Sequence, residues 1–393
     1  MGKRFLFLLL LSSSMLHAQK CIRQADKLIA DKKYRSAWEV LDKEDPKNEN
    51  PTIALAKTDL LLNNFINTVM HKVFTLKDLM PGEKVEDYRG KDVNGSLIKF
   101  DAEMIIDTLL KQHPKDYKLY EGLGNYYYQV FLYFQENWIK KPEELVQLIL
   151  GNYTIANEHG IHNYLVSYRI GFAQLFLQNF QEARKYFQEA ARQNPKYPDA
   201  FYSLSYSNLQ LNQIDSALLN ANKAYELFTD SFNRSDVNLL RGMIYSTKND
   251  TLSCLREYRA AAKLNPKNQG MCLLLLKAEL RYNGKDLDSV TSAYFDMAPK
   301  LGETYNEIIN DYFKFNKLKE ILAFLESKLH EYASDPEVCG NICFYRAFVY
   351  VTMEEKEKAK ADLLKAKEYF GKVFPPGNEI FGTIDEGLKE LEK

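Results

Sequence analysis

The sequence predicts an all-α fold, a solenoid of stacked antiparallel helix pairs, because small residues and a proline recur at a fixed spacing. Gly171, Ala183, Ala190 and Pro195 stand at offsets of 0, 12, 19 and 24. The same offsets return 34 residues later and again after a further 37 residues. A period of this length is typical of repeat proteins. The later marks are Ser205, Ala217 and Ala224, then Gly242, Cys254, Ala261 and Pro266, and near the C-terminus Ala347, Ala359 and Ala366.

Two helices, here named helix A and helix B, account for the spacing within each repeat. A small residue at the first mark lets helix B cross helix A closely, and we expect the small residue twelve positions later to face it. The proline at the last mark ends helix B before the next repeat begins. Each repeat then buries its apolar faces against its neighbours, which makes the whole array one cooperative structure.

The pattern resembles the tetratricopeptide repeat, whose sequence is W-x2-L-G-x2-Y followed by A-x3-F-x2-A and a proline. The resemblance extends over most of the chain and implies a right-handed superhelix with the A helices on its concave face. It also implies a non-catalytic protein that binds a protein or peptide partner, here of unknown identity. The matching residues are Tyr120, Leu123, Gly124 and Tyr127 in one repeat and Ile170, Gly171, Ala183, Phe187, Ala190 and Pro195 in the next.

The register divides the chain into six parts. Residues 1–18 read as a signal peptide, and residues 19–116 as degenerate repeats with an insertion at about 70–100 that is rich in turn signals such as Asn94-Gly95. Residues 117–268 are well-matched repeats, 269–336 degenerate helical repeats, 337–377 a C-terminal repeat and 378–393 a capping helix. Individual helices are expected at Thr52–Phe65, from Pro142, and at Leu273–Leu280, Leu287–Met297, Ile308–Phe315 and Leu318–Tyr332.

The N-terminus predicts export. Lys3 and Arg4 precede the apolar stretch Phe5–Leu16, and Ala18 offers a small residue for cleavage before Gln19. We therefore expect a periplasmic or cell-envelope protein, in a Gram-negative bacterium. The apolar stretch is too short to span a bilayer, and no other segment approaches twenty apolar residues, so no transmembrane segment is expected after signal removal.

Composition and motifs argue against several other functions. The formal net charge of −1 argues against a nucleic-acid partner, which would require a basic surplus. The sequence contains no G-x-S-x-G, P-loop or H-E-x-x-H motif, so we expect no catalytic residue, no cofactor and no metal. Two alternatives stay open: a structural subunit of an envelope or secretion assembly, and an all-helical glycan-processing enzyme. Cys254 and Cys272 fall on neighbouring helices and could pair, although burial as free thiols is the simpler interpretation.

The resemblance also selects a candidate partner-binding site. In the family, helix A positions 2, 5, 9 and 12 line the concave face, and on three successive repeats of this chain they include a group of large side chains. Rigid aromatic residues in a concavity are what protein-binding hot spots tend to use. The alternative is that these rings only pack against one another or under the helix near Phe131, and their exposure distinguishes the two. The candidate residues are Tyr168, Phe172, Tyr202, Tyr206 and Met243.

Overall fold

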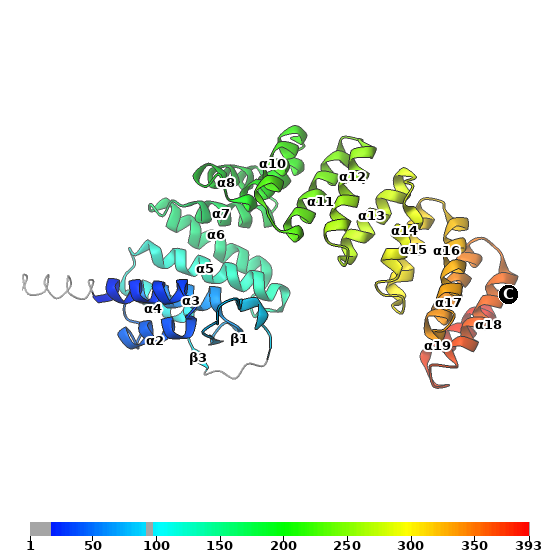
Figure 1. The fold of residues 1–393 in the computed structure, drawn as a ribbon, viewed down its shortest axis with the longest axis horizontal. Coiled ribbons are helices and arrows are strands. Elements are labelled where there is room, and N and C mark those ends of the chain that lie inside the picture. Colours follow the sequence, from blue (N-terminus) through cyan, green and yellow to red (C-terminus); the bar gives the residue numbers. More distant parts are fainter. Residues whose placement is uncertain (1–16, 92–96, 393) are drawn as a thin grey trace, which may run out of the picture. The chain divides into compact units, whose positions relative to one another are not determined.

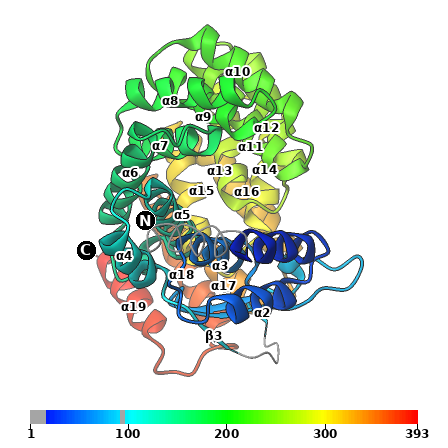
Figure 2. The same cartoon turned by 90° about the vertical axis from the view of Figure 1, so that its left-hand side faces the viewer.

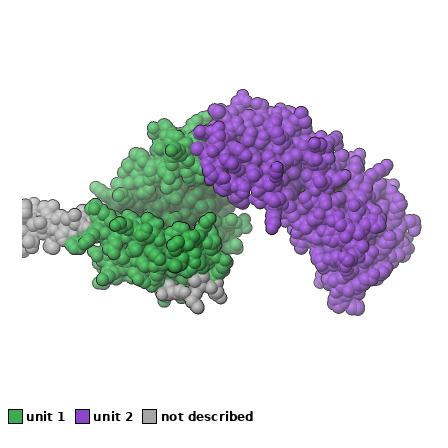
Figure 3. Space-filling model, viewed as in Figure 1, with its two compact units in different colours: residues 1–213 green, residues 214–393 purple. Residues whose placement is uncertain are grey.

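The computed structural model describes residues 17–91 and 97–392, which form two compact units, Met1–Gln213 and Ile214–Lys393 (Figure 3). Within each unit, successive helices pack against one another in chain order (Figure 1). The predicted all-α solenoid of antiparallel helix pairs is therefore confirmed. Most of the predicted signal peptide lies outside the described residues, as does the Asn94-Gly95 turn; residues 17 and 18 already belong to the first described helix.

Unit 1 consists of helix pairs that begin with a helix at residues 17–30. Figure 2 shows α7, α8 and α9 side by side at its C-terminal end. The A helices are residues 17–30, α3, α5, α7 and α9, and the B helices are α2, α4, α6 and α8. Their bounds are α2 (Tyr34–Glu44), α3 (Pro51–Asn64), α4 (Ala102–Gln112), α5 (Tyr117–Phe134), α6 (Pro142–Glu158), α7 (Tyr164–Phe176), α8 (Phe180–Gln193) and α9 (Pro198–Gln210).

Unit 2 continues the pattern through the part of the chain where the repeat motif decays. Its helices α13 to α16 occupy the stretches between Gln269 and Glu331 where helices were predicted. The last helix follows Pro375-Pro376-Gly377, as expected for the capping helix. The bounds are α10 (Ile214–Leu227), α11 (Ser231–Thr247), α12 (Thr251–Leu264), α13 (Gln269–Tyr282), α14 (Leu287–Phe295), α15 (Gly302–Lys314), α16 (Leu318–Glu331), α17 (Pro336–Thr352), α18 (Lys356–Phe370) and α19 (Glu379–Leu391).

The small residues mark helix crossings, although not with the partner that the sequence suggested. Ala183 and Ala190 are fully buried. The atoms nearest to the missing side chain of Gly171, however, belong to the ring of Phe187 and not to Ala183. Gly124 has the same relationship to Tyr153. The aromatic ring of helix B lies on the bare backbone of helix A, because only a glycine leaves room for it there.

The turn from helix A to helix B recurs with one backbone geometry. A residue with positive φ, between 49° and 62°, follows the end of helix A in seven of the described pairs. The next amide donates to the carbonyl five residues back, as from Asn179 to Gln174, which is the hydrogen bond of a Schellman motif. Asparagine adopts this left-handed conformation more readily than most residues, which explains its frequency here. The seven residues are Lys32, Gln178, Asn212, Asn249, Asn283, Asn316 and Glu354.

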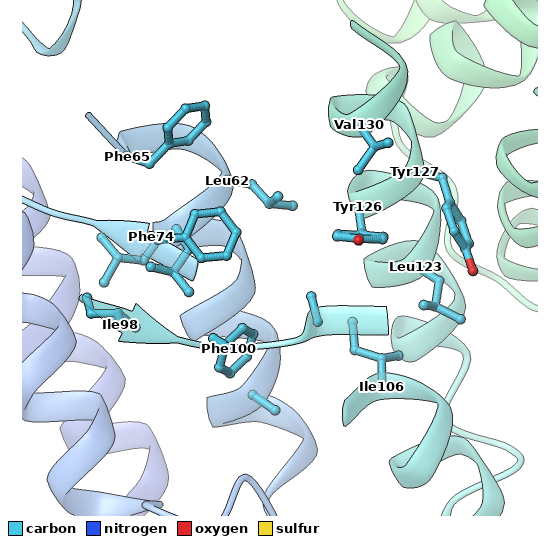
Figure 4. Packing of buried hydrophobic residues seen from close by; sticks show 14 of the residues in the cluster. Leu62, Phe65, Phe74, Ile98, Phe100, Ile106, Leu123, Tyr126, Tyr127 and Val130 are labelled. Carbon is cyan, nitrogen blue, oxygen red and sulfur yellow. The ribbon is translucent and has the colours of Figure 1, made fainter. Parts of the chain in front are cut away.

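The first insertion interrupts the A-to-B turn between α3 and α4 and contains a small antiparallel sheet. Its strands are β1 (Asn67–Val69), β2 (Val73–Thr75) and β3 (Ile98–Lys99), in the order β1-β2-β3. The sequence predicted turns here and did not predict these strands. Figure 4 shows Phe74, Ile98 and Phe100 of this segment together with Leu62 and Tyr126, which belong to two neighbouring helices. These buried side chains join the sheet to the core of unit 1.

A second insertion, at the turn between α5 and α6, meets the first one. It carries the short helix η2 (Gln135–Asn137) and Trp138. The ring of His71, in the first insertion, is 0% exposed, and neither ring nitrogen has a hydrogen-bond partner among the described residues. Burial, reinforced by the positive charge of Arg89, lowers the pKa of His71 to about 4. The rings around His71 are Phe65, Phe74, Tyr133, Phe134 and Trp138.

Three further observations bear on function. In the described part of the chain, no helix is both long and apolar enough to cross a membrane. No group of three or more His, Cys, Asp or Glu side chains is arranged to hold a metal ion within residues 17–91 and 97–392. All five cysteines are buried free thiols, so Cys254 and Cys272 do not pair.

Candidate functional site

The candidate site in unit 1 is built on two A helices, α7 and α9. The side chain of Asn163 accepts a hydrogen bond from the backbone N–H of Val166 and so fixes the start of α7. Pro198 stands in the first turn of α9, where its missing N–H costs nothing. The four aromatic candidates of unit 1 project from these helices and are all half-buried; they are Tyr168, Phe172, Tyr202 and Tyr206.

A pocket of about 490 Å³ opens between α7 and α9. Two of the predicted residues, Phe172 and Tyr206, line it together. Phe176, which the sequence analysis did not single out, also lines the pocket and is 41% exposed. The complete lining is Phe172, Leu175, Phe176, Gln178, Phe180, Tyr206 and Gln210. The structure therefore brings Phe172 and Tyr206 into one mostly apolar site.

Packing of the aromatic rings continues onto α5. The ring of Phe131 stands edge-on to Phe172, with 5.5 Å between centroids, and edge-on to Phe176 at 5.3 Å. Tyr128 makes the same kind of contact with Phe172 at 5.2 Å. Such contacts hold Phe172 in one orientation. Phe172 therefore packs near Phe131 and also lines the pocket.

The other predicted residues lie differently. Tyr168 packs against the rings of Phe187 and Tyr197, with centroids 5.5 Å and 5.1 Å away, and burial raises the pKa of its hydroxyl. Tyr202 is half-buried on α9 and does not line the pocket. Met243 belongs to α11, in unit 2, where it packs half-buried against the core of that unit. Direct participation of these three residues in binding stays a prediction.

A row of polar side chains runs beside the aromatic ones. Arg169 on α7 donates to Asn125 on α5 and to the hydroxyl of Tyr153, the latter at 2.7 Å. Its guanidinium also stacks 4.9 Å from the centroid of Tyr128. Asn125 in turn donates to Asp59 on α3 at 3.5 Å. The sequence analysis missed this row, because no spacing within a single repeat links residues 66 positions apart.

Asp59 stands at the end of this row. Partial loss of hydration raises the pKa of its carboxyl to about 6, although the residue is exposed at the surface of unit 1. The hydrogen bond from Asn125 opposes this rise, while the negative charge of Glu121 adds to it. Two kinds of group therefore lie side by side here, apolar rings and hydrogen-bonding polar groups.

The architecture defines a helical-repeat protein built from stacked antiparallel helix pairs. The tetratricopeptide repeat family model matches residues 168–232, the stretch from α7 into α11. The chain therefore contains tetratricopeptide repeats, as the spacing of Gly171 and Ala183 predicted. No curated protein sequence matches the chain.

Several solved structures resemble the chain. A tetratricopeptide repeat protein from Parabacteroides merdae ATCC 43184 is 17% identical, with 70% of this chain and 99% of that chain covered and a TM-score of 0.39. YrrB, described as a TPR protein with an unusual peptide-binding site, is 17% identical over 49% of this chain and 92% of its own, with a TM-score of 0.38. MamA is 18% identical over 42% of this chain and 88% of its own, with a TM-score of 0.36.

Proposed function

We propose that this chain is a non-catalytic scaffold that binds a protein or peptide partner on the A-helix face of unit 1. The observation that carries the proposal is the pocket of about 490 Å³ between α7 and α9. Phe172 and Tyr206 form its walls, and Phe176 leaves 41% of its surface in water. An apolar side chain of the partner would remove that surface from water, which is the usual source of binding energy at a hot spot.

The polar row beside the pocket supports a peptide as the partner. A bound main chain carries unpaired N–H and C=O groups that need partners when water is displaced. The side-chain amide of Asn125 has both a C=O acceptor and an NH2 donor. Arg169 on one side of it is a donor, and Asp59 on the other side is an acceptor. These three residues come from α7, α5 and α3, so the row crosses several repeats. A segment lying along it would pair its main chain while one side chain fills the pocket.

We further propose that the protein acts outside the cytoplasm, in the periplasm or cell envelope of a Gram-negative bacterium. Lys3, Arg4 and the apolar stretch Phe5–Leu16 support this proposal, because they have the order of a signal peptide. N-terminal sequencing of the protein from its native source tests it, and the expected first residue is Gln19. Recovery of the native protein with Met1 still in place would contradict export by cleavage.

A second candidate, a structural subunit of an envelope or secretion assembly, is favoured by the surface around the two insertions. Val69 and Met70 are 61% and 40% exposed beside the His71 ring cluster, and Tyr133 and Ile139 are 47% and 71% exposed. Exposed apolar residues that gather in one place often mark a contact surface. In such a subunit these residues, rather than the α7–α9 pocket, would make the essential contacts.

The experiment is a selection of phage-displayed peptides on the immobilised full chain, followed by affinity measurements with the selected peptides. Phe176→Ala, and the double change Tyr202→Ala with Tyr206→Ala, should each weaken binding by about tenfold or more, the loss expected for a hot-spot aromatic residue. Phe232→Ala is the matched control, because Phe232 is 59% exposed on α11 and does not line the pocket.

The outcomes separate the two candidates. Variants that keep their helical circular dichroism and lose binding support the pocket. Full binding by the folded Phe176→Ala and double variants would remove the pocket from the proposal. Loss of binding on Tyr133→Ala instead would assign the contact to the insertions.

A further inference from the structure

We infer that unit 2 contains a separate binding site for a peptide segment that carries a carboxylate next to an apolar side chain. The site is a pocket of about 330 Å³ bordered by α11, α12, α13 and α15. Every residue that lines it belongs to unit 2, so the inference does not rest on the α7–α9 pocket. Its charge, its apolar wall and an unsatisfied buried acceptor each indicate one part of this ligand.

The charge of the pocket indicates an anion. Lys277 and Arg281 on α13 and Lys314 on α15 line it, and Asp311 is the acidic residue of the lining. The formal charge of the lining is therefore +2, on a chain whose net charge is −1. The side chains of Lys277 and Lys314 are 44% and 66% exposed, so both ammonium groups can reach a ligand.

The ion pairs within the pocket leave this charge uncompensated. The one carboxylate of Asp311 serves two lysines, with Oδ1 at 3.2 Å from Lys314 Nζ and Oδ2 at 3.7 Å from Lys277 Nζ. Arg281 makes a cation–π contact with Tyr282, at 6.0 Å from the ring centroid, and forms no ion pair with the described residues. A ligand carboxylate beside Arg281 and Lys314 would supply the missing negative charge.

Asp311 indicates that the ligand also brings a hydrogen-bond donor. The residue is 3% exposed, and its Oδ2 atom accepts no hydrogen bond from any group in the described part of the chain. The ammonium of Lys277, 3.7 Å away, compensates the charge of Oδ2 without a hydrogen bond, so this acceptor is still open to a donor. A peptide backbone offers N–H donors close to its side-chain carboxylates. A peptide fits this requirement better than sulfate or chloride, neither of which carries a hydrogen-bond donor at neutral pH.

The wall of the pocket indicates an apolar group beside the carboxylate. Tyr258, Tyr282 and Phe315 line it, and Leu274 leaves 40% of its surface exposed at the rim. The hydroxyl of Tyr282 is held by Ser246 at 3.0 Å, which fixes the ring as part of the wall. A leucine or phenylalanine next to the acidic residue would cover these surfaces.

The test uses three heptapeptide libraries on the immobilised full chain. One has blocked ends and places Asp or Glu beside Leu or Phe, and the second replaces the acidic residue by Asn or Gln. The third lacks acidic residues and ends in a free carboxylate, which separates a terminal carboxylate from a side-chain one. At least one carboxylate library should be retained about tenfold better than the amide library, the usual effect of one charge-assisted contact. Retention should fall as the salt concentration rises.

Variants complete the test. Arg281→Gln and Lys314→Gln should each lower the retention of the carboxylate libraries about tenfold and leave the amide library unchanged. Lys285→Gln is the matched control, since Lys285 is exposed after α13, loses the same charge and does not line the pocket. Phe176→Ala should retain the acidic peptides, because it changes unit 1. Equal retention of carboxylate and amide libraries, or equal losses in Arg281→Gln and Lys285→Gln, would overturn the inference.

Discussion

The ring of Phe187 lies against the backbone of Gly171, so that a Cβ atom at position 171 would stand 2.8 Å from Cδ1 of the ring. Phe187 is fully buried and has no room to retreat. We therefore expect Gly171→Ala to lower the free energy of unfolding by about 1–3 kcal/mol through overpacking. Urea denaturation followed by circular dichroism measures the change.

Gly151 on α6 provides the control for this substitution, because a Cβ atom there would meet no described atom within 4 Å. Gly151→Ala should raise the stability by roughly 0.5–1 kcal/mol, since alanine restricts the unfolded chain more than glycine does. Equal effects at the two positions would show that close packing does not decide the cost at Gly171.

Gln178 adopts a φ of 60° at the turn between α7 and α8, where asparagine stands in several other repeats. The left-handed conformation costs a residue with a side chain roughly 1 kcal/mol, and glycine avoids this cost. We expect Gln178→Gly to raise the midpoint of urea unfolding. Gln178→Val should lower it, because a β-branched residue tolerates positive φ poorly. A lower midpoint for the glycine variant would contradict the strain at this turn.

Arg346 on α17 and Asp362 on α18 form a buried bidentate ion pair, with Nε and Nη2 at 2.6 Å and 2.8 Å from the two carboxylate oxygens. Both side chains are about 5% exposed or less. Arg346→Met should lower the stability by about 3–5 kcal/mol, because the carboxylate stays buried without its partner. Adding Asp362→Leu should recover most of that loss. A double variant no more stable than Arg346→Met would show that the pair itself, rather than the stranded charge, is required.

His71 should make the stability of unit 1 depend on pH. Burial lowers the pKa of His71 to about 4, below its ordinary value of 6.5, so between these values the unfolded chain binds the proton and the folded chain does not. The stabilisation by neutral His71 is therefore present at neutral pH and is lost as the pH falls from about 6.5 towards 4. The full loss is on the order of 3 kcal/mol.

Chemical denaturation of the wild type and of His71→Asn at pH 7 and pH 4.5 measures this effect. Asparagine tolerates the φ of 46° at this position and does not titrate. The wild type should lose more stability on acidification than the variant. Asp59 titrates in the same range in both proteins and cancels in the difference. Identical losses in the two proteins would exclude His71 as the source.

The helices could be predicted from sequence because their determinants are local. Pro142 and Leu318 begin α6 and α16 where expected, and the small residue at each first mark locates a crossing. The site was predicted less completely. The repeat register selected Phe172 and Tyr206 as candidates for one site. Phe176 is also a phenylalanine, but it does not stand at one of the helix A positions from which the candidates were chosen. Phe176 lines the pocket because of how α9 packs against α7, and the sequence of a single repeat does not specify that packing.

The remaining features depend on contacts between distant parts of the chain. Strands β1 and β2 have only three residues each, too few for a period of two to stand out. Burial of Phe74 in the core that α3 and α5 share stabilises their pairing, and these helices are not part of the strand sequences. The contact of Phe187 with Gly171 was likewise not predicted. The spacing shows which positions of helix A and helix B recur, but not which residue of helix B touches the glycine of helix A.

Both insertions of unit 1 enter at A-to-B turns, and the ring of His71 in the first insertion contacts Trp138 of the second as well as Tyr133 and Phe134 at the end of α5. Neither has a complete apolar interior of its own. Excision of residues 135–141 alone would remove Trp138 from the rings around His71, and excision of the sheet alone would remove the contact of Trp138 with His71. The two segments are therefore one structural module in two pieces of chain, to be transplanted into another repeat protein together or not at all.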